Sequence, residues 1–156
     1  MPVKPVNAIN VESVKGLSGY PPEFATQVAG RTKRKLGDIF GLTNFGVNFT
    51  DLDPGSASAL YHHHETQDEF VYVVSGVATI LLGDDQYELS AGECIGFPAG
   101  TGVGHQVVNR SEEIVSYLEV GDRNSDDKVE YPKDDIRATV GPDGSWIFTR
   151  KNGDSF

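Results

Sequence analysis

Short apolar segments that end at glycine or proline constrain the fold of this chain more than any other feature. Its 156 residues include 18 glycines and 8 prolines. A helical domain would instead show long segments with an apolar residue every three or four positions. Here the segments have the length and the apolar pattern of strands, and turn residues such as Asp53-Pro54-Gly55 separate them. The sequence therefore predicts an all-β domain.

The expected strands lie mainly in the middle of the chain. They comprise residues 44–51, 58–64, 69–75, 77–82, 86–89, 93–97, 105–109 and 114–120. We expect residues 44–120 to form a barrel, residues 1–43 an N-terminal arm that packs on the barrel or on a partner subunit, and residues 121–156 a C-terminal extension. Within the extension we expect one helical turn at 134–138 and a final strand at 145–149, with Trp146 packed on the barrel or a partner.

The charge of the chain argues against a nucleic-acid partner. The formal net charge is -10 and the isoelectric point is about 4.7, whereas phosphate backbones are bound by basic patches. The one basic cluster, 31–35, is expected to be a solvated loop or to protect the edge of a sheet. Alternatively, Arg31 or Arg34 lies at the mouth of a pocket and holds an anionic group of a substrate.

The single cysteine and the first ten residues indicate the cellular compartment of the protein. Cys94 has no partner for an intrachain disulfide and favours a reducing compartment. We expect its side chain to be buried like a small apolar group. The first ten residues lack the apolar core of a signal peptide, and no apolar run approaches the ~20 residues that cross a bilayer. The sequence thus predicts a cytoplasmic protein without a membrane partner.

Three of the four histidines are consecutive, at 62–64. In an extended segment His62 and His64 point to one side and His63 to the other. A turn at 65–67 would fold the strand that begins at Glu69 back beside the histidine strand, so that its carboxylate joins the two imidazoles. Two imidazoles and a carboxylate suit a divalent transition metal (Fe, Mn, Zn, Ni or Cu) better than calcium or magnesium.

Two spaced motifs in this region resemble those of the cupin superfamily. The first, G(x)5HxH(x)3-4E(x)6G, is similar to Gly55, His62, His64, Glu69 and Gly76. The second, G(x)5PxG(x)2H(x)3N, is similar to Gly92, Pro98, Gly100, His105 and Asn109. Two intervals are longer than in the motifs, because six residues separate Gly55 from His62 and four separate Gly100 from His105. Both insertions lie beside turn residues and therefore lengthen loops.

The resemblance covers residues 55–109 closely and 44–120 loosely, and the short interval between its motifs is similar to that of compact microbial single-domain cupins. It implies a double-stranded β-helix, which is a small jelly-roll barrel, with irregular N-terminal and C-terminal extensions. It also implies a homodimer and a metal ion held by His62, His64, Glu69 and His105. We expect Asn109 to hold a turn or to donate a hydrogen bond near the site.

Three neutral imidazoles and one carboxylate would leave two positions open on an octahedral ion. The expected pocket walls are Leu60, Val71, Val73 and Val107, with Glu119 beside them. Glu119, Tyr61, Tyr72 and Tyr117 are candidates for proton transfer. Our leading hypothesis is a metal-dependent enzyme that oxygenates, isomerises, decarboxylates or cleaves a small oxygen-rich metabolite. The alternative is a binding protein that captures a small molecule through the metal without turnover.

Overall fold

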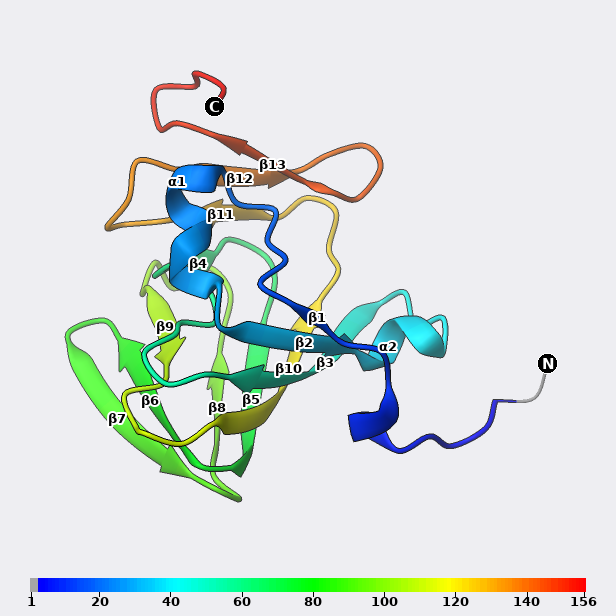
Figure 1. Ribbon diagram of the computed structural model, residues 1–156. Coiled ribbons are helices and arrows are strands. Elements are labelled where there is room, and N and C mark those ends of the chain that lie inside the picture. Colours follow the sequence, from blue (N-terminus) through cyan, green and yellow to red (C-terminus); the bar gives the residue numbers. More distant parts are fainter. Residues whose placement is uncertain (1–2) are drawn as a thin grey trace.

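Strands separated by tight turns make up most of the chain (Figure 1). The computed structural model describes residues 3–156. In these residues the short helical elements are η1 (Ala8–Asn10), α1 (Pro22–Ala25), η2 (Thr26–Val28) and α2 (Leu36–Ile39). The strands are β1 (Val14–Lys15), β2 (Arg31–Lys35), β3 (Phe45–Leu52), β4 (His63–His64), β5 (Glu69–Ser75), β6 (Val77–Leu82), β7 (Asp85–Ser90), β8 (Cys94–Phe97), β9 (His105–Val108), β10 (Val115–Asp122), β11 (Lys128–Glu130), β12 (Arg137–Val140) and β13 (Trp146–Thr149).

Two antiparallel sheets form the barrel. One has the order β1-β2-β3-β10-β5-β8 and the other the order β7-β6-β9. β10 lies between β3 and β5 and pairs with both, although it follows them by many residues. Non-consecutive neighbours of this kind are typical of a jelly roll, so the predicted all-β jelly-roll fold is confirmed.

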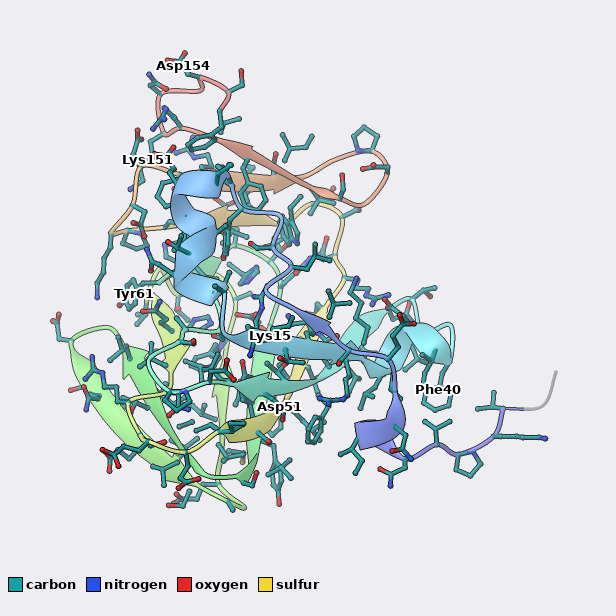
Figure 2. All side chains as sticks on the ribbon, in the orientation of Figure 1. Lys15, Phe40, Asp51, Tyr61, Lys151 and Asp154 are labelled. Atoms are coloured by element: carbon teal, nitrogen blue, oxygen red, sulfur yellow. The ribbon has the colours of Figure 1, made fainter. Side chains whose placement is uncertain are left out.

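The core of the barrel lies between these sheets. Apolar side chains from seven strands fill it, and Figure 2 shows how densely side chains occupy the interior. The buried members are Leu52, Val71, Val73, Ala78, Ile80, Leu89, Phe97, Val107, Val115 and Tyr117. Because side chains alternate along a strand, each strand sends every second residue into this core and the others to its outer face.

The two flanking segments contain more strands than the irregular extensions that we expected. β2 of the N-terminal arm extends the six-stranded sheet by pairing with β3. The three C-terminal strands form a separate sheet together with β4, in the order β13-β12-β11-β4, and this sheet lies over one end of the barrel beside α1 (Figure 1). Leu60, Val129, Tyr131, Ile136 and Ala138 form a second buried core there.

Two sequence predictions about single segments are wrong. Residues 134–138 do not form a helical turn, because Ile136 and Ala138 are both buried in the second core and this two-residue period suits β12. Cys94 is exposed, because it pairs with Tyr72 on the outer face of the sheet while its neighbour Ile95 packs against the core. In residues 3–156, no helix has the length and apolar character needed to span a membrane.

Candidate metal centre

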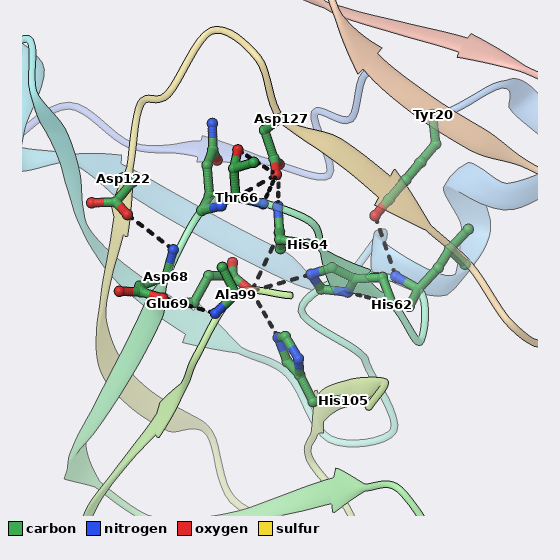
Figure 3. A network of polar contacts seen from close by, with 12 residues as sticks. Tyr20, His62, His64, Thr66, Asp68, Glu69, Ala99, His105, Asp122 and Asp127 are labelled. Atoms are coloured by element: carbon green, nitrogen blue, oxygen red, sulfur yellow. Dashed lines mark hydrogen bonds and ion pairs between the residues drawn. The ribbon is translucent and has the colours of Figure 1, made fainter. Parts of the chain in front are cut away.

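Three imidazoles meet at one carboxylate oxygen inside the barrel (Figure 3). Oε2 of Glu69 lies 2.7 Å from Nε2 of His105, 3.3 Å from Nε2 of His62 and 3.4 Å from Nε2 of His64. The three histidine side chains are nearly buried, whereas that of Glu69 is 31% exposed. The structure thus brings together the four side chains that the motifs pointed to.

Different strands position these groups from those that the sequence suggested. His62 and His105 exchange both backbone hydrogen bonds, at 3.1 and 2.7 Å. β4 pairs with β11, and β5 pairs with β10 and β8. The prediction that β5 folds back beside the histidine strand is therefore wrong. Both edges of β5 are paired within the six-stranded sheet, and Val71 and Val73 point into the barrel core, whereas Phe70, Tyr72 and Val74 on its outer face are partly exposed.

Hydrogen bonds to the second ring nitrogens orient two of the imidazoles. Nδ1 of His62 donates to the backbone oxygen of Leu60 at 2.7 Å, and Nδ1 of His64 donates to Oδ2 of Asp127 at 2.6 Å. Nε2 of each ring therefore faces Glu69 and is the nitrogen available to a proton or a metal ion. A donor bond of this kind fixes the ring orientation of histidines that bind metals.

Asp127 is a site residue that the sequence did not suggest. It is 1% exposed, and its Oδ1 accepts hydrogen bonds from the backbone nitrogens of Thr66 and Gln67 and from the hydroxyl of Thr66. It lies 63 positions from His64, in a tail without apolar periodicity. No spacing in the sequence distinguishes it from the adjacent Asp126.

The electrostatics follow from this packing. Although burial opposes ionisation, the hydrogen bonds from three histidines hold the pKa of Glu69 well below its usual value. Burial also opposes the charged form of His64, yet its hydrogen bonds to Asp127 and Glu69 raise its pKa to about 9. Burial lowers the pKa of His105. The cluster therefore contains a stable carboxylate that favours positive charge among the imidazoles, which either a proton on His64 or a metal ion can supply.

The donor set fits a transition-metal ion. Nitrogen and oxygen ligands bind such ions at about 2.1 Å, so neighbouring ligand atoms lie roughly 3 Å apart. The contacts of Glu69 Oε2 with the imidazoles are close to that spacing. Within the described residues, the set whose ligand atoms all lie within 4.8 Å of one another is His62, Glu69 and His105. His64 approaches Glu69 but lies farther from at least one other member.

A cavity of about 490 Å³ opens beside the cluster. Among the predicted wall residues, Val71, Val107, Glu119 and Arg31 line it. Leu60 and Val73 are not among its walls, because Leu60 is buried in the second core and Val73 lies deep between the sheets.

The predicted anion contact at Arg34 is wrong. Arg34 pairs with Phe49, and Phe49 pairs with Leu118. The side chains of these three residues lie on the outer face of the six-stranded sheet, away from the cavity. Arg34 there forms an ion pair with Asp51 at 2.7 Å. Arg31, Lys33 and Lys35 project to the other face of β2 and line the cavity. The side chains of the basic cluster thus alternate between the cavity and the outer face of the sheet.

The tyrosines of the cavity are not those named from the sequence. Tyr61 donates to the backbone oxygen of Gly83 at 3.2 Å, Tyr72 lies on the outer face, and Tyr117 is fully buried. Tyr20 and Tyr131 line the cavity instead, with ring centroids 6.0 Å apart. Both come from the flanking segments, which the sequence motifs do not cover.

Asn109 behaves as predicted. It is fully buried, and its amide nitrogen donates to the backbone oxygens of Leu52 at 2.8 Å and Glu113 at 2.7 Å. These bonds fix the turn between β9 and β10. Asn109 therefore supports the strand that carries His105 and does not itself line the cavity.

Comparisons with known proteins agree with this architecture. A family model described as Cupin domain matches residues 48–121. A sugar phosphate isomerase from a cupin superfamily, from Silicibacter pomeroyi DSS-3, is 35% identical with a TM-score of 0.91, over 98% of this chain and 96% of that chain. A candidate sugar phosphate isomerase from Acidithiobacillus ferrooxidans is 32% identical with a TM-score of 0.71, over 81% of this chain and 80% of that one.

A more distant likeness shows the fold alone. The polyketide cyclase RemF from Streptomyces resistomycificus is 22% identical with a TM-score of 0.62, over 78% of this chain and 80% of that chain. A comparison with curated proteins finds no match.

Proposed function

Because this chain belongs to the cupin superfamily, as its likeness to a cupin along almost its whole length shows, we propose that it is a metal-dependent isomerase of a small phosphorylated sugar. The observation that carries the proposal is the convergence of three imidazole Nε2 atoms on Oε2 of Glu69 beside a cavity. The reaction class is inferred from the two sugar phosphate isomerases to which the chain is similar.

His62, His64, Glu69 and His105 would hold the metal, which we infer to be Fe, Mn, Zn, Ni or Cu. When bound, such an ion supplies Lewis acidity that polarises a carbonyl group and stabilises negative charge on its oxygen. Asp127 keeps the His64 ring in place, and the backbone oxygen of Leu60 does the same for His62. These residues orient the ligands before any ion binds, which reduces the cost of assembling the site.

A cluster of cationic side chains on one strand supports an anionic substrate. Carboxylates also line the cavity, but Arg31, Lys33 and Lys35 lie together on β2 and line it there. Arg31 donates to the backbone oxygens of Ser58 and Leu17, and Lys33 is paired with Glu119. Lys35 takes part in none of the ion pairs among residues 3–156, and its exposed, cationic side chain is suited to a phosphate.

Metal-dependent turnover tests the proposal. The metal-loaded protein and a chelator-treated sample are incubated in D2O with a panel of aldose and ketose phosphates of four to six carbons, followed by proton NMR. We expect at least one pair to interconvert, and the rate to fall at least ~100-fold without metal.

A matched pair of variants provides the control. His105→Ala should abolish the interconversion, whereas His63→Ala should retain it, because His63 is not among the residues that line the cavity. Binding of a sugar phosphate by the metal-loaded protein without any conversion would instead favour the non-catalytic binding protein.

A further inference from the structure

We propose that Glu119 is the carboxylate that carries the proton between two adjacent carbons of the substrate; this inference rests on the proposed isomerase function. Glu119 lies on β10, where its register partners are Val71 on β5 and Asn48 on β3. Gly121, two residues further along β10, is the partner of Glu69. The Cα atoms of the two glutamates are therefore separated by one strand and two residues, roughly 8 Å. A small molecule that contacts the metal cluster can reach both.

One oxygen of Glu119 is held firmly by the protein. Oε1 is 2.5 Å from Nζ of Lys33, and it accepts hydrogen bonds at 3.3 Å from Nδ2 of Asn48 and from the hydroxyl of Thr50. Oε2 has no hydrogen-bond or ion-pair partner among residues 3–156. The side chain is 23% exposed and lines the cavity. This asymmetry fixes the carboxylate in place and leaves its second oxygen for a substrate.

Other carboxylates of the cavity are less suited to this role. Glu69 is surrounded by three imidazoles. The Asp38 side chain, which forms an ion pair with Arg123, is 42% exposed, against 23% for Glu119. Asp122 is exposed and accepts a hydrogen bond from the backbone nitrogen of Asp68 at 3.0 Å. Glu119 combines a fixed position, partial burial and an unused oxygen, which are the properties of a general base.

The step is a proton transfer that needs no further reagent. Oε2 takes the proton from the carbon next to the carbonyl group, and the C–H electrons form the carbon–carbon double bond of an enediolate. The carbonyl π electrons move to the carbonyl oxygen. Protonated Glu119 then returns the proton to the former carbonyl carbon, while the hydroxyl proton passes between the two oxygens through solvent. An aldose becomes a ketose, or the reverse, with all atoms conserved.

Labelling with a phosphorylated epoxide, glycidol phosphate, tests whether the second oxygen of Glu119 is free to react. This experiment does not require the substrate to be known. A cavity carboxylate attacks an epoxide carbon, the ring C–O bond breaks, the alkoxide takes a proton from water, and an ester remains on the protein. We expect peptide mapping by mass spectrometry to place this ester on Glu119. The Glu119→Gln variant should remain unlabelled, and Glu113→Gln, at an exposed turn, should be labelled like the wild type.

Exchange kinetics test the proton transfer itself. With a substrate identified, Glu119→Gln should lower the incorporation of solvent deuterium into the sugar by roughly 100- to 10,000-fold. Its metal content and its KM should change little, and Glu119→Asp should recover part of the rate. A glutamine variant with nearly wild-type exchange, or an ester found on another residue or on none, would overturn the inference.

The two proposals fail in different ways. If chelation leaves turnover unchanged, or if the histidine variants keep their metal, the metal-dependent function is wrong. If turnover needs the metal but not Glu119, only the inference about Glu119 is wrong. If no sugar phosphate is converted, the epoxide labelling alone decides for or against the available oxygen of Glu119.

Discussion

At the scale of single residues, the site depends on a buried carboxylate that does not line the cavity. Asp127 accepts four hydrogen bonds, from Nδ1 of His64, the backbone nitrogens of Thr66 and Gln67, and the hydroxyl of Thr66. It therefore fixes both the ring of His64 and the loop that leads to Glu69. The negative charge of Asp127 also favours positive charge beside His64, whether a proton or a metal ion supplies it.

Asp127→Asn should weaken metal binding by roughly 10- to 100-fold. Asparagine has nearly the same shape but lacks the charge, and one of its two acceptor positions becomes a donor that faces the backbone nitrogens. Competition between the protein and a chelator of known affinity measures the change. The exposed neighbour serves as control, because Asp126→Asn should have wild-type affinity. Equal affinities for both variants would show that Asp127 does not orient the site.

Part of this site was predictable from the sequence, because spacing reports side-chain direction within a strand. The HxH pattern placed His62 and His64 on one side, and the two motifs together named Glu69 and His105. The contact between His64 and Asp127 was not predictable, because it depends on the pairing of β4 with β11 across more than sixty residues. Alternation fixes which face a residue occupies but not which strand lies beside it.

At the scale of elements, the same alternation of side chains explains which strand predictions were confirmed and which were wrong. Most barrel strands were expected within one or two residues of their observed bounds. Cys94 was wrongly expected to be buried, since residue type suggested an interior position and its place opposite Tyr72 decided otherwise. The helical turn predicted at 134–138 does not form. Five residues of mixed polarity do not show, from the sequence alone, that Ile136 and Ala138 pack in a second core.

The turn between β5 and β6 provides a test at this scale. Gly76 has a φ of +78°, and a Cβ added there would lie 2.8 Å from the backbone oxygen of Ile114. Gly76→Ala should therefore lower the free energy of unfolding by about 2–4 kcal/mol, from left-handed backbone strain and the clash together. Urea unfolding followed by circular dichroism measures it.

Gly55→Ala is the matched control for this turn. Gly55 has a φ of +79°, but no atom lies within 4 Å of its added Cβ. It should lose only the backbone part, about 1–2 kcal/mol. Equal losses for the two variants would show that the contact with Ile114 does not constrain the turn.

At the scale of the whole molecule, two cores join the barrel to its flanking segments. Tyr117 is buried in the barrel core, and Tyr131 packs against Tyr20 in the second core. Burial raises the pKa of all three phenols, and the charge of Glu119 adds to the effect at Tyr117. The homodimer and the cytoplasmic location expected from the sequence stay predictions.

These tyrosines predict a loss of stability at alkaline pH. The folded protein keeps their protons above the ordinary pKa of 10.0, whereas the unfolded chain releases them. The unfolded state thus binds fewer protons, so the free energy of unfolding falls as pH rises above about 10. Phenolate absorbance from these three residues should appear together with unfolding, and Tyr117→Phe should make the pH dependence shallower. Release of all phenol protons before unfolding would contradict the burial of these groups.

The central claim is that four side chains from three segments of the chain hold one ion: His62 and His64 from one, Glu69 from β5 and His105 from β9. Metal content after reloading with a single metal and exhaustive dialysis, measured by inductively coupled plasma mass spectrometry, tests it most directly. We predict one ion per chain for the wild type and for His63→Ala, and less than one tenth of that for His62→Ala and His105→Ala. Wild-type metal content in the His62 and His105 variants, or its loss in His63→Ala alone, would contradict the account.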